Sequence, residues 1–260
     1  MFLFCLKKNF CDGWDNIFLL LVVNLLIVIL AMAAYFAIAA AVIHQALMLA
    51  GFVLFLCVIL IPVFAFGSLA SRVAAFKSVT MGEFFAQFAR VWKDAVRFAL
   101  IIAALVIIGV VALPFYLRMG TLLGIALGAV IFWFFLISVM AFQWFIPLRF
   151  LMNDSFLKSL KKSYIIFFDN TAFSVCYFFY QLALIALSVI VFFLLPSFAG
   201  IVLAQTNALR LMLYKYDWFE ANPQEAAKKK RHIPWDELLA EDRESLGPRS
   251  LRSFIFPWKD

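Results

Sequence analysis

The sequence predicts an all-α, polytopic membrane protein with six transmembrane helices. Of its 260 residues, 67% are hydrophobic and only 14% are charged, and the mean hydropathy is +1.03. A soluble domain is nearer to half apolar and a quarter charged. In addition, no Asp, Glu, Lys or Arg lies between Asp15 and Arg72. Since roughly 20 apolar residues cross a bilayer as a helix, this stretch is long enough for two crossings.

Six apolar stretches are candidates for these spans. We expect helices at residues 17–41, 47–69, 98–117, 122–146, 171–195 and 197–213. Pro62 lies inside the second of them, where a bilayer helix tolerates a kink. Residues 1–213 would then form a transmembrane domain and residues 214–260 a cytoplasmic tail.

The distribution of basic residues predicts the orientation. With six spans, 21 of the 22 Lys and Arg residues fall on the side of the two termini, and only Arg118 falls on the other side. Basic loops remain in the cytoplasm, so both termini are predicted to be cytoplasmic. This rule also accounts for the net charge of +7 and leaves no reason to predict nucleic-acid binding.

An internal repeat divides the predicted spans into three helical hairpins. Residues 7–16 (KKNFCDGWDN) and 161–170 (KKSYIIFFDN) align without gaps ahead of the first and fifth spans, and Trp92-Lys93-Asp94 is a weaker match ahead of the third. The second, fourth and sixth spans each end in one Arg followed by three apolar residues. Each hairpin is thus opened by an Asp and closed by an Arg on the cytoplasmic face: Asp15, Asp94, Asp169, Arg72, Arg149 and Arg210.

These acidic and basic residues have two interpretations. An Asp near a helix N-terminus and an Arg near a C-terminus complement the helix dipole, and Arg also reaches the lipid headgroups. This interpretation needs no shared site and is the one we favour. The alternative is a functional ring of Asp and Arg side chains.

Two cytoplasmic segments have the 3.6-residue period of amphipathic helices. In residues 82–97 the polar positions follow a 4-3-4-3 spacing opposite an aromatic face, and residues 155–168 repeat the pattern with lysines. We expect them to lie in the membrane interface or to extend the spans into the cytoplasm. A helix that docks a partner protein is the alternative.

The residues inside the predicted spans argue against catalysis. Ionisable side chains within a membrane usually mark function, and the first five spans contain none. Their deep polar residues are neutral and suit hydrogen bonds between helices; with the sixth span they are Asn24, Gln143, Gln181, Gln205 and Asn207. The cysteines and histidines have no metal-ligand spacing, and no catalytic motif is present. We therefore predict neither an enzyme nor a cofactor.

The tail has two features of its own. Lys228, Lys229, Lys230 and Arg231 form a basic cluster suited to anionic headgroups. Near the end, the sequence FIFPW contains Phe254, Phe256 and Trp258, which would be exposed apolar groups unless they dock. The same chain, lipid and a partner protein are the three candidate docking surfaces.

The order of elements resembles the YesL-type family of small bacterial membrane proteins. The matching features, over about residues 10–215, are the first hairpin, the amphipathic segment 82–97 ahead of the third span, and the short last span with polar residues. The first span lacks the proline break that we would expect of that family. The resemblance implies a protein of the bacterial cytoplasmic membrane, without an assigned role, in a family sometimes considered beside sugar-uptake systems.

Two functional hypotheses follow. The first is a non-enzymatic accessory or regulatory component of a membrane assembly, which contacts another membrane protein through its cytoplasmic helices or tail. The second is a substrate-binding or transport subunit for a small neutral solute. The second hypothesis requires a pocket near Asn24, Gln143 and Gln181.

Overall fold

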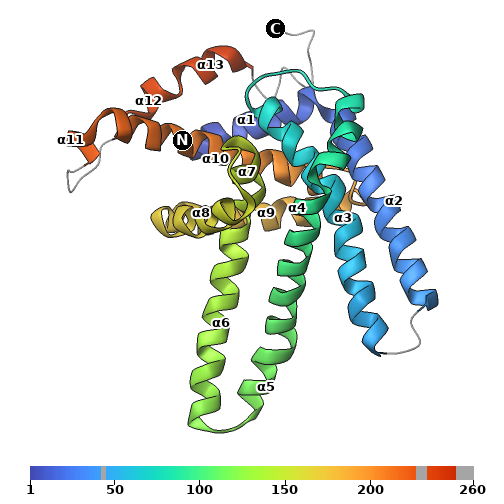
Figure 1. Ribbon diagram of the computed structural model, residues 1–260. Coiled ribbons are helices and arrows are strands. Elements are labelled where there is room, and N and C mark those ends of the chain that lie inside the picture. Colours follow the sequence, from blue (N-terminus) through green and yellow to red (C-terminus); the bar gives the residue numbers. More distant parts are fainter. Residues whose placement is uncertain (42–44, 227–232, 250–260) are drawn as a thin grey trace.

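The computed structural model describes residues 1–41, 45–226 and 233–249, and all of their regular structure is helical (Figure 1). Five of these helices are long and apolar enough to cross a membrane. In chain order the elements are α1 (Phe2–Asp15), α2 (Ile17–Ala41), α3 (Gln45–Ala74), α4 (Met81–Ile107), η1 (Ile108–Ala112), α5 (Leu113–Arg118), α6 (Leu122–Phe142), α7 (Phe145–Leu151), α8 (Phe156–Asp169), α9 (Thr171–Ile190), α10 (Ser197–Ala221), α11 (Pro223–Ala226), α12 (Trp235–Leu238) and α13 (Ala240–Leu246).

Two long hairpins extend from a layer of shorter helices (Figure 1). The first consists of α2 and α3, and the bounds of α2 agree with the predicted first span. The second runs down through α4, η1 and α5 and returns through α6. Thr80 begins α4 with a capping box, in which its side chain accepts from the backbone N–H of Glu83. The layer at the upper end contains α1, α7, α8 and α10 to α13.

The two predicted amphipathic segments adopt different structures. Residues 82–97 form the first part of α4 and continue without a break into the apolar part of that helix. Of the arrangements we considered, they therefore extend a span. Residues 155–168 instead form the separate helix α8, which runs across the end of α6 (Figure 1).

Helix α10 occupies the centre of the molecule. It packs against α1, α2, α3, α7 and α9, and 13 of its 25 residues are buried. This helix contains the predicted sixth span, but it is not among the five helices that are apolar enough to cross a membrane. The polar residues that lower its apolar character, such as Gln205 and Asn207, face other helices. Six spans are therefore not confirmed, and neither is a threefold repeat.

Helices α9 and α10 form an antiparallel pair whose turn lies beside α2. The side-chain amide of Asn24 donates to the carbonyls of Leu194 and Pro196, each at 2.9 Å, and its oxygen accepts from the N–H of Ala199 at 2.9 Å. Asn24 is completely buried, and it is the eighth of the 25 residues of α2. At ~1.5 Å per residue it lies about 10 Å from the start of α2. The α9–α10 pair thus turns back beside the first third of α2.

Asn24 is expected to be essential for holding this turn. Replacing it by Leu leaves the carbonyl of Leu194 and the N–H of Ala199 without partners in an apolar environment, and each such group costs about 1–3 kcal/mol. The carbonyl of Pro196 still accepts from the N–H of Gly200. The free energy of unfolding in lipid or detergent should fall by ~2 kcal/mol or more. Leu25→Ala is the matched control, because Leu25 is 41% exposed on the outer side of the same helix. An equal effect of both substitutions would contradict this role for Asn24.

Candidate functional site

Helix α1 is amphipathic with its polar face turned inward. Lys8 and Asp12 are buried, whereas Leu3, Phe10 and Trp14 are 80%, 42% and 45% exposed. A surface helix of a soluble protein has the opposite arrangement. The outer face of α1 therefore suits the membrane interface, where aromatic side chains collect.

A buried ion pair fixes α1 to its neighbours. Lys8 Nζ is 2.9 Å from the carboxylate of Asp12, and both side chains are almost fully buried. The Lys8 ammonium also lies 3.5 Å from the centre of the Phe76 ring, a cation–π contact with the residues that follow α3. Asp12 accepts a further hydrogen bond from the amide of Asn207 on α10, at 2.9 Å. One ion pair thus joins α1 to α10 and to the end of α3.

Asn9 extends this cluster to α9. Its amide nitrogen donates to the hydroxyl of Tyr177 at 3.1 Å, and its oxygen accepts from Asn207 at 3.0 Å. Tyr177 in turn donates to the backbone carbonyl of Ala204. Among the described residues, Oδ1 of Asn207 has no hydrogen-bond partner. The polar face of α1 is therefore held by side chains from two other helices.

Burial sets the ionisation of the groups on α1. It lowers the pKa of Lys8, against the effect of the neighbouring Asp12 carboxylate, and it raises the pKa of Asp12 despite Lys8. Burial also raises the pKa of the Cys5 thiol to about 12, so this thiol is neutral near pH 7 and a poor nucleophile. The described residues contain no group of three His, Cys, Asp or Glu side chains that could hold a metal ion. The contacts of the cluster join α1 to α9 and α10.

A second ion pair, between the partly buried Arg210 and the buried Asp242, fixes the tail to the transmembrane helices. Arg210 donates two hydrogen bonds of 3.1 Å to Asp242 on α13, and a third of 2.6 Å to the carbonyl of Ala74 at the end of α3. Tyr214 also donates to Asp242, and burial raises the pKa of Tyr214 to about 12. Helix α10 continues past residue 213 to Ala221, so the tail begins as part of a helix of the core.

The structure separates most residues of the Asp–Arg ring that was the alternative interpretation. Only Asp94 and Arg149 are partners of each other, at 2.9 Å. The other four bind elsewhere: Arg72 to Glu83, Asp15 to Arg249, Asp169 to Lys215 and Arg210 to Asp242. The six residues therefore form separate contacts rather than one ring.

The aligned segments 7–16 and 161–170 have matching local structures. Each ends a 14-residue helix at an Asp, continues through one non-helical Asn, and then begins a long apolar helix. The amide of Asn16 donates to the carbonyl of Asp12, and that of Asn170 to the carbonyl of Ile166, four residues back in both cases. The Asp-Asn pairs thus mark the corners where a short helix meets a long one.

The deep glutamines form a continuous chain of hydrogen bonds. Gln205 donates to Gln181 at 2.7 Å, Gln181 donates to Gln143 at 2.6 Å, and Gln143 donates to the carbonyl of Ser174 at 3.1 Å. This chain joins α10, α9 and the end of α6. Asn24 is not part of it, since its amide is fully used at the α9–α10 turn.

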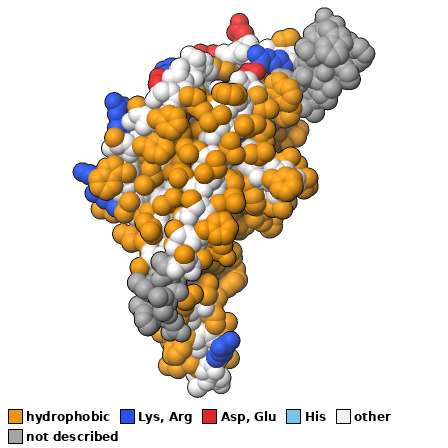
Figure 2. All heavy atoms as spheres, turned by 90° about the vertical axis from the view of Figure 1, so that its right-hand side faces the viewer, with side chains coloured by type: hydrophobic (Ala, Val, Ile, Leu, Met, Phe, Trp, Pro, Cys, Tyr) orange, Lys and Arg blue, Asp and Glu red, His pale blue; other side chains and the backbone are white. Residues whose placement is uncertain are grey.

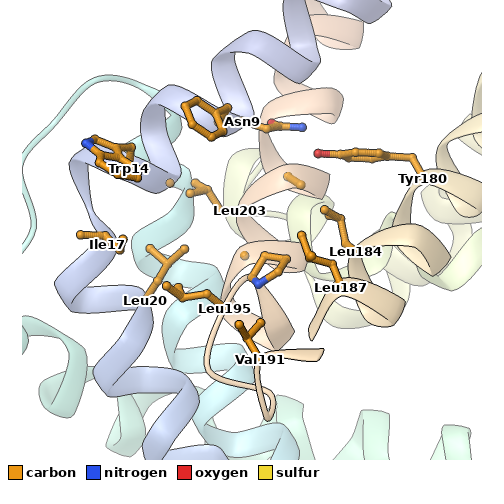
Figure 3. A pocket seen from close by; sticks show the side chains of 15 residues that line it. Asn9, Trp14, Ile17, Leu20, Tyr180, Leu184, Leu187, Val191, Leu195 and Leu203 are labelled. Carbon is orange, nitrogen blue, oxygen red and sulfur yellow. The ribbon is translucent and has the colours of Figure 1, made fainter. Parts of the chain in front are cut away.

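A cleft of about 370 Å³ lies between the α1–α2 corner and the α9–α10 pair (Figure 3). Figure 3 shows Ile17, Leu20 and Trp14 on one side and Leu184, Leu187 and Val191 on the other. Asn9 and Tyr180 face each other at the end next to α1. Sequence reasoning missed this cleft because its walls come from distant parts of the chain. The sequence signal that could have indicated the cleft is the wholly apolar segment of residues 190–196, which forms the α9–α10 turn.

The comparisons with known proteins give no family for this chain. No family model, curated protein or solved structure matches it. The resemblance to the YesL-type family therefore stays a prediction. The predicted tail contacts, namely Lys228, Lys229, Lys230, Arg231, Phe254, Phe256 and Trp258, lie outside the described residues.

The ion pair of Lys8 and Asp12 is expected to show strong coupling. Asp12→Asn leaves the buried ammonium without a counter-ion and should reduce the free energy of unfolding by ~3–5 kcal/mol. Adding Lys8→Met removes the unpaired charge, so the double variant should recover much of this loss. Unfolding of the two single variants and the double variant in detergent measures the coupling. Additive effects would show that the two side chains do not stabilise each other.

Proposed function

We propose that the chain is a non-enzymatic accessory or regulatory component of a membrane assembly, located in the bacterial cytoplasmic membrane with both termini in the cytoplasm. Its contact surface would be the cap, which we define as α1, α8, the C-terminal part of α10, α12 and α13. The observation that carries the proposal is the acidic outer face of α12 and α13, held on the transmembrane helices by the pair of Arg210 and Asp242.

Charged side chains are concentrated at the end of the molecule that carries the cap. In Figure 2 hydrophobic side chains cover most of the visible face, and charged groups lie mainly at the top and along one edge of its upper half, apart from one basic group near the lower tip. Arg118 ends α5 at that tip in Figure 1. This asymmetry supports a bilayer around the long hairpins and an aqueous environment at the cap.

The α9–α10 pair is consistent with both termini lying on the cytoplasmic side. The two long hairpins account for an even number of crossings. A pair that turns back beside Asn24 adds no net crossing, so both termini remain on the same side. The 21 basic residues predicted on that side support its assignment to the cytoplasm.

The face of α12 and α13 suggests the chemistry of the partner. Leu239, Asp242 and Leu246 are buried, whereas Glu237, Glu241 and Glu244 are exposed on the other side. Cytoplasmic loops of membrane proteins carry an excess of Lys and Arg. An acidic face beside the membrane therefore suits a second membrane protein with basic loops, and the charge complementarity would favour its association.

The alternative hypothesis, a transport subunit for a small neutral solute, has less support. The amides proposed to line its pocket are used in contacts between helices: Gln181 donates to Gln143, and Asn24 binds the α9–α10 turn. A solute would have to replace these hydrogen bonds.

A photo-activatable residue in place of Ser245, which is exposed on α13, tests the partner contact in living cells. We expect it to capture a membrane protein, and the triple change of Glu237, Glu241 and Glu244 to Lys should reduce this capture at least fivefold. The same residue placed at Thr121, in the turn between α5 and α6, is the control and should not capture that protein.

Two results would contradict the proposal. One is capture that is unaffected by the triple change, and the other is equal capture from Thr121. A Ser245→Cys thiol should also react with an impermeant maleimide only after the cells are opened. Reaction in intact cells would place the cap outside.

A further inference from the structure

We propose that the cleft between the α1–α2 corner and the α9–α10 pair holds an acyl chain of a lipid from the cytoplasmic leaflet. This inference does not depend on partner docking at the cap. It shares with the proposed function the bilayer around the apolar helices and the cytoplasmic position of the cap, which assigns the leaflet.

The walls of the cleft suit a hydrocarbon chain. Leu20, Leu184, Leu187, Leu195 and Leu203 all line it, and its volume of about 370 Å³ is in the range of small-molecule sites, ~300–1,000 Å³. Its polar groups are confined to one end (Figure 3). An apolar cleft of this kind is not filled by water, because water needs two to four polar partners.

The cleft is continuous with the surface that faces lipid. Next in sequence to its lining residues Ile17 and Val191, Phe18 is 72% exposed, and Ile190 and Phe192 are 74% and 83% exposed. These bulky apolar groups belong in the hydrocarbon region rather than in water. Lipid is therefore the molecule that surrounds the opening, and an acyl chain can enter sideways without leaving the bilayer.

The polar end of the cleft determines the direction in which the acyl chain would lie. Trp14 and Phe10 stack at the outer edge of this end, with ring centres 6.1 Å apart, as expected at the boundary between headgroups and hydrocarbon. The glycerol end of the lipid would lie near these rings, and the acyl chain would run toward Val191. The amide of Asn9 is already bound to Tyr177 and Asn207, so selectivity for one headgroup is not expected.

The C-terminal residues of the same chain are a second candidate occupant of the cleft and have to be distinguished from lipid. Arg249 lies 2.6 Å from Asp15, next to Trp14, and the apolar sequence at residues 254–258 follows only a few residues later. A variant that ends at Arg249 separates the two occupants.

Gly13 offers a way to fill the cleft with little risk to folding. A Cβ atom at Gly13 would meet no other atom within 4 Å, and the same holds for Gly82 on α4, outside the cleft. Neither glycine has a positive φ, and both lie in helices, where most other residues are more favourable than glycine. Gly13→Phe is therefore the test variant, and Gly82→Phe is its matched control.

The probes are two phosphatidylethanolamines, each incorporated into nanodiscs with the full-length protein. One carries a diazirine near the start of an acyl chain, to reach Tyr180, and the other carries it near the end, to reach Leu195. After irradiation, labelling of Tyr180 and Leu195, both partly buried in the cleft, is compared with labelling of Trp133, which is 59% exposed on α6. The wild-type protein should show clear labelling of Tyr180 and Leu195. Gly13→Phe should reduce their labelling relative to Trp133 at least fivefold, and Gly82→Phe should leave it unchanged.

Three results would overturn the proposal. The first is labelling of the wild-type protein that is confined to outward-facing residues such as Trp133, and this result needs no variant. The second is an unchanged ratio in Gly13→Phe. The third is labelling of the cleft only in the variant that ends at Arg249, which would assign the cleft to the tail.

Discussion

The arrangement of the central helices depends on the amide of Asn24, which satisfies three backbone groups at the turn between α9 and α10. In hydrocarbon an irregular turn is tolerated only where protein groups replace the hydrogen bonds of water. Because this turn is held beside the first third of α2, α10 rises from there through the middle of the molecule. It reaches the end of α3 at Arg210, which binds the carbonyl of Ala74. The positions of α1 and α13 follow, since Asn207 of α10 binds Asp12 of α1 and Arg210 of α10 pairs with Asp242 of α13.

The two ion pairs contribute more to the specific placement of helices than to stability. Removing a charge from water costs several kcal/mol, so the pairs of Lys8 with Asp12 and of Arg210 with Asp242 are weak sources of stability. Their geometry is specific, however, because each charge has one oppositely charged partner at a defined place. Burial of the polar face of α1 also turns Phe10 and Trp14 outward, toward the cleft and the membrane interface. The charges that hold the cap in place thus also shape the edge of the proposed lipid site.

The sequence predicted the features that depend on local pattern. The membrane class, the bounds of α2 and the amphipathic periods of residues 82–97 and 155–168 all follow from spacing and composition. The Asp-Asn pairs at 15–16 and 169–170 were found by alignment, although their role at helix corners was not. The features that sequence reasoning missed depend on contacts between distant segments. The inward polar face of α1, the burial of α10 and the partners of Arg72 and Asp169 cannot be derived from periodicity, which assumes that polar faces meet water.

The depth of the α9–α10 turn tests the account most directly. A spin label can be attached at Phe192, which is 83% exposed, in a variant without the native cysteines, and its collisions with oxygen and with a water-soluble nickel complex report its depth in the bilayer. The account predicts a label inside the hydrocarbon, at the depth of a label at Leu25, which follows Asn24 on α2. A label at the headgroup level of Thr121, in the α5–α6 turn, would show that α9 crosses the whole membrane. That result would contradict the structure described for the central helices.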